Sequence, residues 1–199
     1  MTNSEDIDRL NSEFYNAAGS SFDKIPFEDI LPGLIKKYGK GHEVLEIGSA
    51  TGALAAWLEE LGYSVTCLEP ALKPAALAKA KGLRVQTLRI QDFETADTFD
   101  MVLAISSLIH VPKKELPAQI KKIARFLRPK GIFIASFIEG SDESLEDPTH
   151  KGKMRFFSKC SEPELDQLLS PYFDVMESHK IYSKKMDRAF LLHVCVKKS

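Results

Sequence analysis

The sequence predicts an α/β chain built as a Rossmann-like doubly wound sheet of about seven strands, the last antiparallel, with an N-terminal helical lid. Short apolar runs alternate with amphipathic stretches between residues 42 and 137, and parallel strands need crossover helices of this kind. The 199 residues are 44% hydrophobic and 28% charged, as in a single globular domain. We expect the lid at 1–40, the core at 41–137, and a loop, a helix and a hairpin at 138–199.

Two amphipathic helices are predicted in the first 40 residues. Ile7, Leu10 and Phe14 share one face of the first helix, and the apolar residues of 27–38 follow the same spacing more strongly in the second. Between them lies a break of alanine, glycine and serine at 17–21. Such a break predicts a mobile connection.

Five apolar runs predict the strands of the core. The runs from 44, 65 and 101 are buried-strand patterns, and glycines close several of the intervening helices. The five predicted strands are 44–47, 65–68, 83–88, 101–105 and 132–137.

The C-terminal part has a different pattern. Ser161 and Glu164 have the spacing of a capping box, which predicts the start of a helix. Two strand-like stretches follow at 172–181 and 189–196, and the polar link between them is too short for a crossover helix. We therefore expect an antiparallel hairpin.

A loop containing two glycines connects the first predicted strand to the following helix. In Gly48-Ser-Ala50-Thr-Gly52, the glycines allow a ligand to approach the backbone, and the helix N-terminus presents free N–H groups. The spacing Gly48-x-Ala50-x-x-Ala53 is also a degraded dinucleotide fingerprint. The loop by itself is therefore also compatible with a nicotinamide-dependent oxidoreductase.

More residues support another reading of the same segment. The run from Val44 to Gly52 resembles the first motif of the class I S-adenosylmethionine-dependent methyltransferases, V-L-[DE]-x-G-x-G-x-G, with Ala50 in place of the middle glycine. That alanine is tolerable if its φ is negative. Later motifs resemble the same family in the same order, at 91–93, 99–105 and 127–131, so that the resemblance covers about 42–137.

The resemblance implies S-adenosylmethionine as cofactor and gives roles to several acids. Glu46 would hold the α-ammonium of the methionine moiety, and Glu69, at the end of the second strand, would accept the ribose hydroxyls. Asp92 would accept the adenine amino group, and Phe93 would line the ring pocket. The complete set of predicted cofactor-binding residues is Glu46, Gly48, Ser49, Ala50, Gly52, Glu69, Pro70, Gln91, Asp92, Phe93 and Ser106.

Methyl transfer from a sulfonium requires alignment of donor and acceptor more than a fixed catalytic group. His110, after the fourth strand, is the best candidate for a general base because its ordinary pKa is near neutral. Tyr15, on the N-terminal helix, is the second candidate. For both residues a packing role stays open. By likeness to small-molecule methyltransferases, Arg155 and Phe156 would face the acceptor pocket.

We therefore expect methyl transfer to a small-molecule acceptor, with release of S-adenosylhomocysteine. A non-catalytic module that binds the same cofactor and an NAD(P)-dependent oxidoreductase are the alternatives. No ligand set for a metal is visible, and the near-balanced charge of −1 disfavours a nucleic-acid partner. No apolar run is long enough for a membrane span. Three well-separated cysteines predict a reducing, cytoplasmic setting. The sequence gives neither the acceptor nor the oligomeric state.

Overall fold

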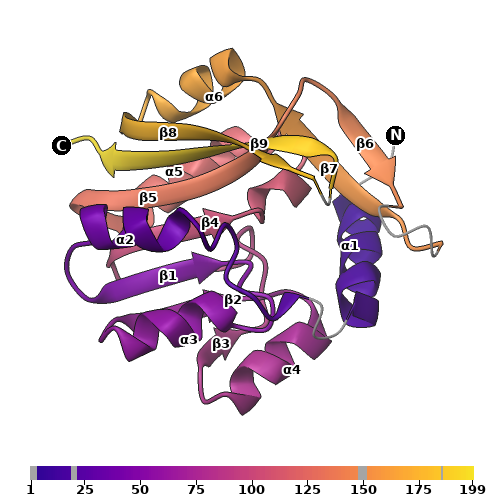
Figure 1. Cartoon of the computed structure of the whole chain (residues 1–199), viewed down its shortest axis with the longest axis horizontal. Helices are drawn as coiled ribbons and strands as arrows, with labels where there is room; N and C mark the ends of the chain where they lie inside the picture. Colours follow the sequence, from indigo (N-terminus) through magenta and orange to yellow (C-terminus); the bar gives the residue numbers. More distant parts are fainter. Residues whose placement is uncertain (1–3, 19–21, 148–151, 185) are drawn as a thin grey trace.

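Nine strands form one mixed sheet in the computed structural model of the chain (Figure 1), which describes residues 4–18, 22–147, 152–184 and 186–199. Residues 19–21 of the predicted mobile break lie outside these described residues. Five strands are parallel, with each predicted core strand present. In their order across the sheet they are β3 (Arg84–Gln86), β2 (Ser64–Leu68), β1 (Glu43–Ile47), β4 (Phe99–Ile105) and β5 (Leu127–Glu139).

The predicted C-terminal hairpin is confirmed. β8 (Phe173–Ser183) pairs antiparallel with β9 (Arg188–Lys197), and β9 pairs antiparallel with β5 along Ile132–Ile138. Because β9 is central between β5 and β8, its apolar side chains are buried on both faces.

Two further strands lie where the sequence predicted a loop. β6 (Glu143–Glu146) and β7 (Arg155–Cys160) form an antiparallel hairpin, and the end of β7 pairs with the end of β5. The described residues therefore form nine strands, two more than the approximately seven expected. β7 was missed because four consecutive residues, Arg155 to Ser158, are buried. Such a run lacks the period-two alternation that signals a strand.

Helices cover both faces of the sheet (Figure 1). α5 (Leu116–Phe126) and α6 (Glu162–Leu169) pack on one face, and the capping box at the start of α6 is present. The other face carries α2 (Leu31–Tyr38), α3 (Ala53–Glu60) and α4 (Leu72–Ala80). Because Leu31, Leu34 and Ile35 are buried in this layer, α2 belongs to the packed core and is not part of a lid.

α1 (Ser4–Ala18) stands apart from these layers, beside the carboxyl ends of the parallel strands (Figure 1). Asn11 Oδ1 accepts the N–H of Phe156 at 3.0 Å, and Asn16 Oδ1 accepts the N–H of Lys73 at 2.8 Å. The helix therefore bridges β7 and α4. Among the described residues, none of the helices has the length and apolarity needed to cross a bilayer.

Candidate functional site

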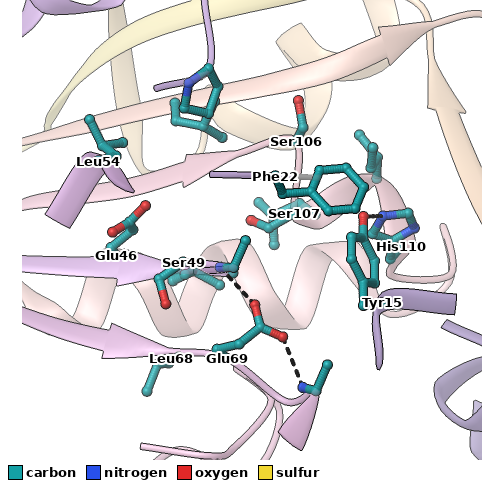
Figure 2. A pocket seen from close by; sticks show the side chains of 18 of the residues that line it. Tyr15, Phe22, Glu46, Ser49, Leu54, Leu68, Glu69, Ser106, Ser107 and His110 are labelled. Carbon is teal, nitrogen blue, oxygen red and sulfur yellow. Dashed lines mark hydrogen bonds between the residues drawn. The ribbon is translucent and has the colours of Figure 1, made fainter. Parts of the chain in front are cut away.

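A cavity of about 670 Å³ lies at the carboxyl ends of β1, β2 and β4, with α1 along one side. Open α/β sheets bind their ligands at this edge, and the volume suits a small organic molecule. Figure 2 shows side chains from both the sheet and the N-terminal segment pointing into it. The predicted site residues that line it are Tyr15, Glu46, Gly48, Ser49, Ala50, Glu69, Pro70, Gln91, Ser106, His110 and Arg155.

Gly48 is required by the geometry of the loop that follows β1. Its φ is +75°, and a Cβ atom there would lie 2.5 Å from the Cβ of Ser107, closer than side-chain atoms can approach. Its N–H donates to the carbonyl of Leu68 at 2.7 Å. The loop is thus held against the ends of β2 and β4, where its backbone faces the cavity.

Ala50 lies in the left-handed region, which glycine adopts more readily. Its φ is +48°, so the condition of a negative φ, under which the alanine would be tolerated without strain, is not met. The Ala50 N–H donates to Glu69 Oε2 at 2.8 Å, and this bond holds the strained residue in place. An L residue in the left-handed region costs about 1 kcal/mol.

Replacing Ala50 by glycine is therefore expected to stabilise the protein. We expect the free energy of unfolding of Ala50→Gly to rise by about 1 kcal/mol, because the strain is removed. Chemical denaturation followed by circular dichroism measures it. Ala56→Gly, within α3, is the matched control and should lower stability by about 1 kcal/mol. A loss of stability in Ala50→Gly would contradict the strained conformation.

Gly52 has a packing role that differs from its predicted role. Its φ is +79°, and an added Cβ would lie 2.3 Å from Leu83 Cδ1 and 3.1 Å from Ala78 Cβ. Gly52 does not line the cavity. It lets the start of α3 lie against α4, and its assignment to cofactor binding is not supported by its position.

Glu46 is a buried carboxyl group in the wall of the cavity. It is 5% exposed, and its Oε2 atom has no hydrogen-bond partner. Burial, with a smaller contribution from the negative charge of Glu69, raises the pKa of Glu46 to about 8. The group is therefore mostly protonated at neutral pH and suits a cationic ligand that would restore its charge.

Glu69 is fixed by two backbone N–H groups (Figure 2). Oε1 accepts from Ala71 and Oε2 accepts from Ala50, both at 2.8 Å. Burial raises the pKa of Glu69, and these two hydrogen bonds oppose that effect. Each carboxylate oxygen has a second lone pair available for a ligand hydroxyl.

Two of the predicted adenine-binding residues lie elsewhere. Phe93 is 1% exposed and packs edge-to-face on Phe126 in the core, so the expectation that it lines the pocket is wrong. Asp92 is exposed, pairs with Arg89 at 2.6 Å and does not line the cavity. Gln91 does line it. The turn that places Gln91 in the cavity wall directs the two residues that follow it, Asp92 and Phe93, away from the cavity.

Three serines surround the end of β4 and the glycine loop. The hydroxyl group of Ser107 is buried with no partner among the described residues, and the buried hydroxyl group of Ser49 is hydrogen-bonded to the Cys67 side chain. Ser106 has a φ of +53°, and its N–H donates to Ser136 Oγ at 2.8 Å. Ser107 is not among the predicted site residues, although its place shortly after an apolar strand is a usable signal.

Tyr15, His110 and Arg155 form one hydrogen-bonded chain in the cavity wall. His110 Nδ1 lies 2.7 Å from the carbonyl of Phe156, which can only accept, so that Nδ1 carries the proton. His110 Nε2 then accepts from the Tyr15 hydroxyl at 2.8 Å. Tyr15 Oη in turn accepts from Arg155 Nη1 at 3.0 Å. The contact of Tyr15 with His110 is visible in Figure 2.

The surroundings of His110 make it a weak base. Burial, followed by the positive charge of Arg155, lowers its pKa to about 3. The imidazole is therefore neutral at pH 7 and holds a proton poorly. The expectation that the pKa of His110 suits a general base at neutral pH is wrong for this arrangement. Burial raises the pKa of Tyr15, and Arg155 opposes it.

The comparisons with known proteins give a match to one family and to a common fold. Residues 45–135 match the family model described as a methyltransferase domain. This segment includes the glycine loop, Glu69, Gln91 and the end of β4, but not α1 or Arg155.

Two curated relatives match this chain over alignments of more than 100 residues. The cyclopropane-fatty-acyl-phospholipid synthase of Escherichia coli (strain K12) is 27% identical over 146 residues, which are 70% of this chain and 38% of that protein. Methyltransferase GfsG of Streptomyces halstedii is 32% identical over 104 residues, 46% of this chain and 36% of the relative. The matched segments thus span well under half the length of these two relatives.

A solved structure shares the fold over the full chain. A 1,6-didemethyltoxoflavin-N1-methyltransferase from Burkholderia thailandensis, with bound 1,6-didemethyltoxoflavin and S-adenosylhomocysteine, superposes with a TM-score of 0.79 and 20% sequence identity. The alignment covers 100% of this chain and 92% of that one. At this identity the likeness concerns the fold.

Proposed function

We propose that this chain, a member of the class I S-adenosylmethionine-dependent methyltransferases, transfers a methyl group from that cofactor to a small-molecule acceptor and releases S-adenosylhomocysteine. The observation that carries the proposal is the pair Glu46 and Glu69, two buried carboxyl groups beside the Gly48 loop in one cavity. They match the ammonium and ribose groups of the cofactor in chemistry.

The unsatisfied atoms of the cavity fit this cofactor. Glu46 Oε2 and Ser107 Oγ are buried without a partner among the described residues, which is costly unless a ligand satisfies them. Glu46 would hold the ammonium, Glu69 the ribose hydroxyls, and Gln91 the edge of the adenine pocket. When bound, the cofactor supplies an electrophilic methyl group on sulfonium sulfur.

The remaining task of the protein is to position the acceptor and exclude water. α1 closes one side of the cavity and brings the Tyr15 hydroxyl to His110. Because His110 Nε2 already accepts the Tyr15 hydroxyl and its pKa is low, these two residues would position the acceptor and would not take a proton from it.

The two alternatives find less support. The non-catalytic alternative rests on Ala50 and on the lack of a clear base. The loop itself does not favour that alternative, because Ala50 keeps a left-handed conformation and its bond to Glu69. A nicotinamide-dependent oxidoreductase is less supported because residues 45–135, which include the glycine loop, match a methyltransferase domain.

Label transfer tests the proposed function. Incubation with methyl-labelled S-adenosylmethionine and fractionated small metabolites should place label in the small-molecule fraction. Gly48→Val, whose side chain would collide with Ser107, should lose at least tenfold of this activity while staying folded by circular dichroism. Label appearing only in added RNA, DNA or protein would overturn the choice of acceptor class. Absence of transfer from every fraction would favour the non-catalytic module.

A cytoplasmic location is part of the same proposal. Cys67, Cys160 and Cys195 are all buried and free, as is common in proteins of a reducing compartment.

A further inference from the structure

Arg155 is a buried cation with no acidic partner among the residues that the structure describes. Arg155 is 5% exposed and lines the cavity. Nη1 donates to the uncharged Tyr15 hydroxyl, and the Nε atom is buried without a partner. Glu146, directly opposite Arg155 in the β6–β7 hairpin, is bound instead to Arg188 and Lys159.

Aromatic rings surround the guanidinium group. Its central carbon lies 4.3 Å from the ring centre of Phe14, 4.5 Å from that of Phe157 and 5.4 Å from that of Tyr15. These rings attract a cation but do not neutralise it. A charge buried in a ligand cavity without a counterion is expected to receive one from the ligand.

We infer that Arg155 binds an anionic group, a carboxylate or a similarly planar oxyanion, on the methyl acceptor. The inference rests on the proposed function and narrows its substrate class. Arginine presents two parallel N–H groups to such an anion, and burial strengthens the pairing. Phe22, Phe27 and Phe190 also line the cavity, so the body of the acceptor is apolar and suits aromatic walls.

A carboxylate could reach Arg155 from two sources, the acceptor or the amino-acid end of the cofactor. The position of Arg155 favours the acceptor. Arg155 is bonded to Tyr15, and Tyr15 is bonded to His110, which follows β4 in the chain. In Figure 2, Tyr15 and His110 lie at one side of the view, and the unpartnered Glu46 carboxyl lies at the other side.

The test is calorimetric titration of the protein saturated with S-adenosylhomocysteine. Benzoate is the probe, and benzamide is its neutral isostere. We expect benzoate to bind at least tenfold more tightly than benzamide, and Arg155→Met to abolish that preference. Binding of S-adenosylhomocysteine to Arg155→Met should stay within twofold of the unsubstituted protein.

Arg188→Met is the matched control. Arg188 also lies over Phe157, at 4.9 Å, but it pairs with Glu146 and does not line the cavity. Arg188→Met should melt at a lower temperature and keep the preference for benzoate. Arg155→Met loses no ion pair and should melt at the same or a higher temperature, so its loss of benzoate binding would not reflect unfolding.

Two results would overturn the inference. Weakening of S-adenosylhomocysteine binding by tenfold or more in Arg155→Met would assign Arg155 to the cofactor carboxylate. Equal binding of benzoate and benzamide, or binding of neither, would remove the anion site. Failure of S-adenosylhomocysteine to bind the unsubstituted protein is a different outcome, which counts against the proposed function itself.

Discussion

Glu69→Gln is expected to weaken the binding of S-adenosylhomocysteine at least tenfold. The carboxylate accepts the N–H groups of Ala50 and Ala71 with one oxygen each, and both oxygens retain a lone pair for the ribose hydroxyls. In glutamine one of the two positions becomes an NH₂ donor, which opposes a backbone N–H donor. The substitution therefore disturbs the glycine loop and the ribose contact together. Calorimetric titration measures the change in Kd.

The control for this prediction is Glu60→Gln. Glu60 is exposed at the end of α3, so this substitution should leave the Kd of S-adenosylhomocysteine unchanged. Circular dichroism and thermal melting confirm that both variants fold. An unchanged Kd in folded Glu69→Gln would remove Glu69 from the cofactor site.

Binding of S-adenosylhomocysteine near neutral pH is expected to release a proton from Glu46. Without ligand, burial raises the pKa of Glu46 to about 8, so that most of the molecules carry this proton at pH 7. The ligand ammonium favours the charged carboxylate and lowers that pKa. Below pH 8, binding must therefore include deprotonation, and the affinity should rise about tenfold per pH unit between pH 6 and 7.5.

Calorimetry in buffers of different ionisation enthalpy measures the protons released. Glu46→Gln should release none at this site, and its affinity should be nearly independent of pH over the same interval. Glu59→Gln, on the exposed face of α3, should behave as the unsubstituted protein. Two results would contradict the role of Glu46. One is proton release by Glu46→Gln equal to that of the unsubstituted protein, and the other is an affinity of the unsubstituted protein for S-adenosylhomocysteine that falls as the pH rises from 6 to 7.5.

The parallel core was predictable because its signals are local. β1, β4 and the second half of β5 contain apolar runs that are almost wholly buried, and burial from both faces produces such runs. β7 could not be predicted in this way, because its sequence is not an apolar run although its residues are buried. Arg155 to Ser158 mix charged, aromatic and polar residues, yet all four are buried by α1 and the sheet, a fact that depends on distant segments.

The proposed cofactor half of the site was more predictable than the proposed acceptor half. Glu46, Gly48 and Glu69 lie on consecutive strands and loops, so that their meeting follows from parallel topology alone. The chain from Arg155 through Tyr15 to His110 joins residues up to 140 positions apart. Its effect on the pKa of His110 arises from burial and a neighbouring charge, neither of which a single sequence displays.

Individual residues within motifs were harder to place than the motifs. Asp92 and Phe93 directly follow Gln91, but the turn sends Asp92 to Arg89 and Phe93 to Phe126. A motif identifies a segment, whereas the direction of each side chain depends on the backbone and on packing.

Calorimetric titration of the purified protein with S-adenosylhomocysteine, with NADH and NADPH as controls, tests the central claim most directly. The cavity that contains Glu46, Gly48 and Glu69 predicts micromolar binding of S-adenosylhomocysteine and no binding of either nicotinamide. Binding of a nicotinamide in its place, or of none of the three, would contradict the assignment of this site to S-adenosylmethionine.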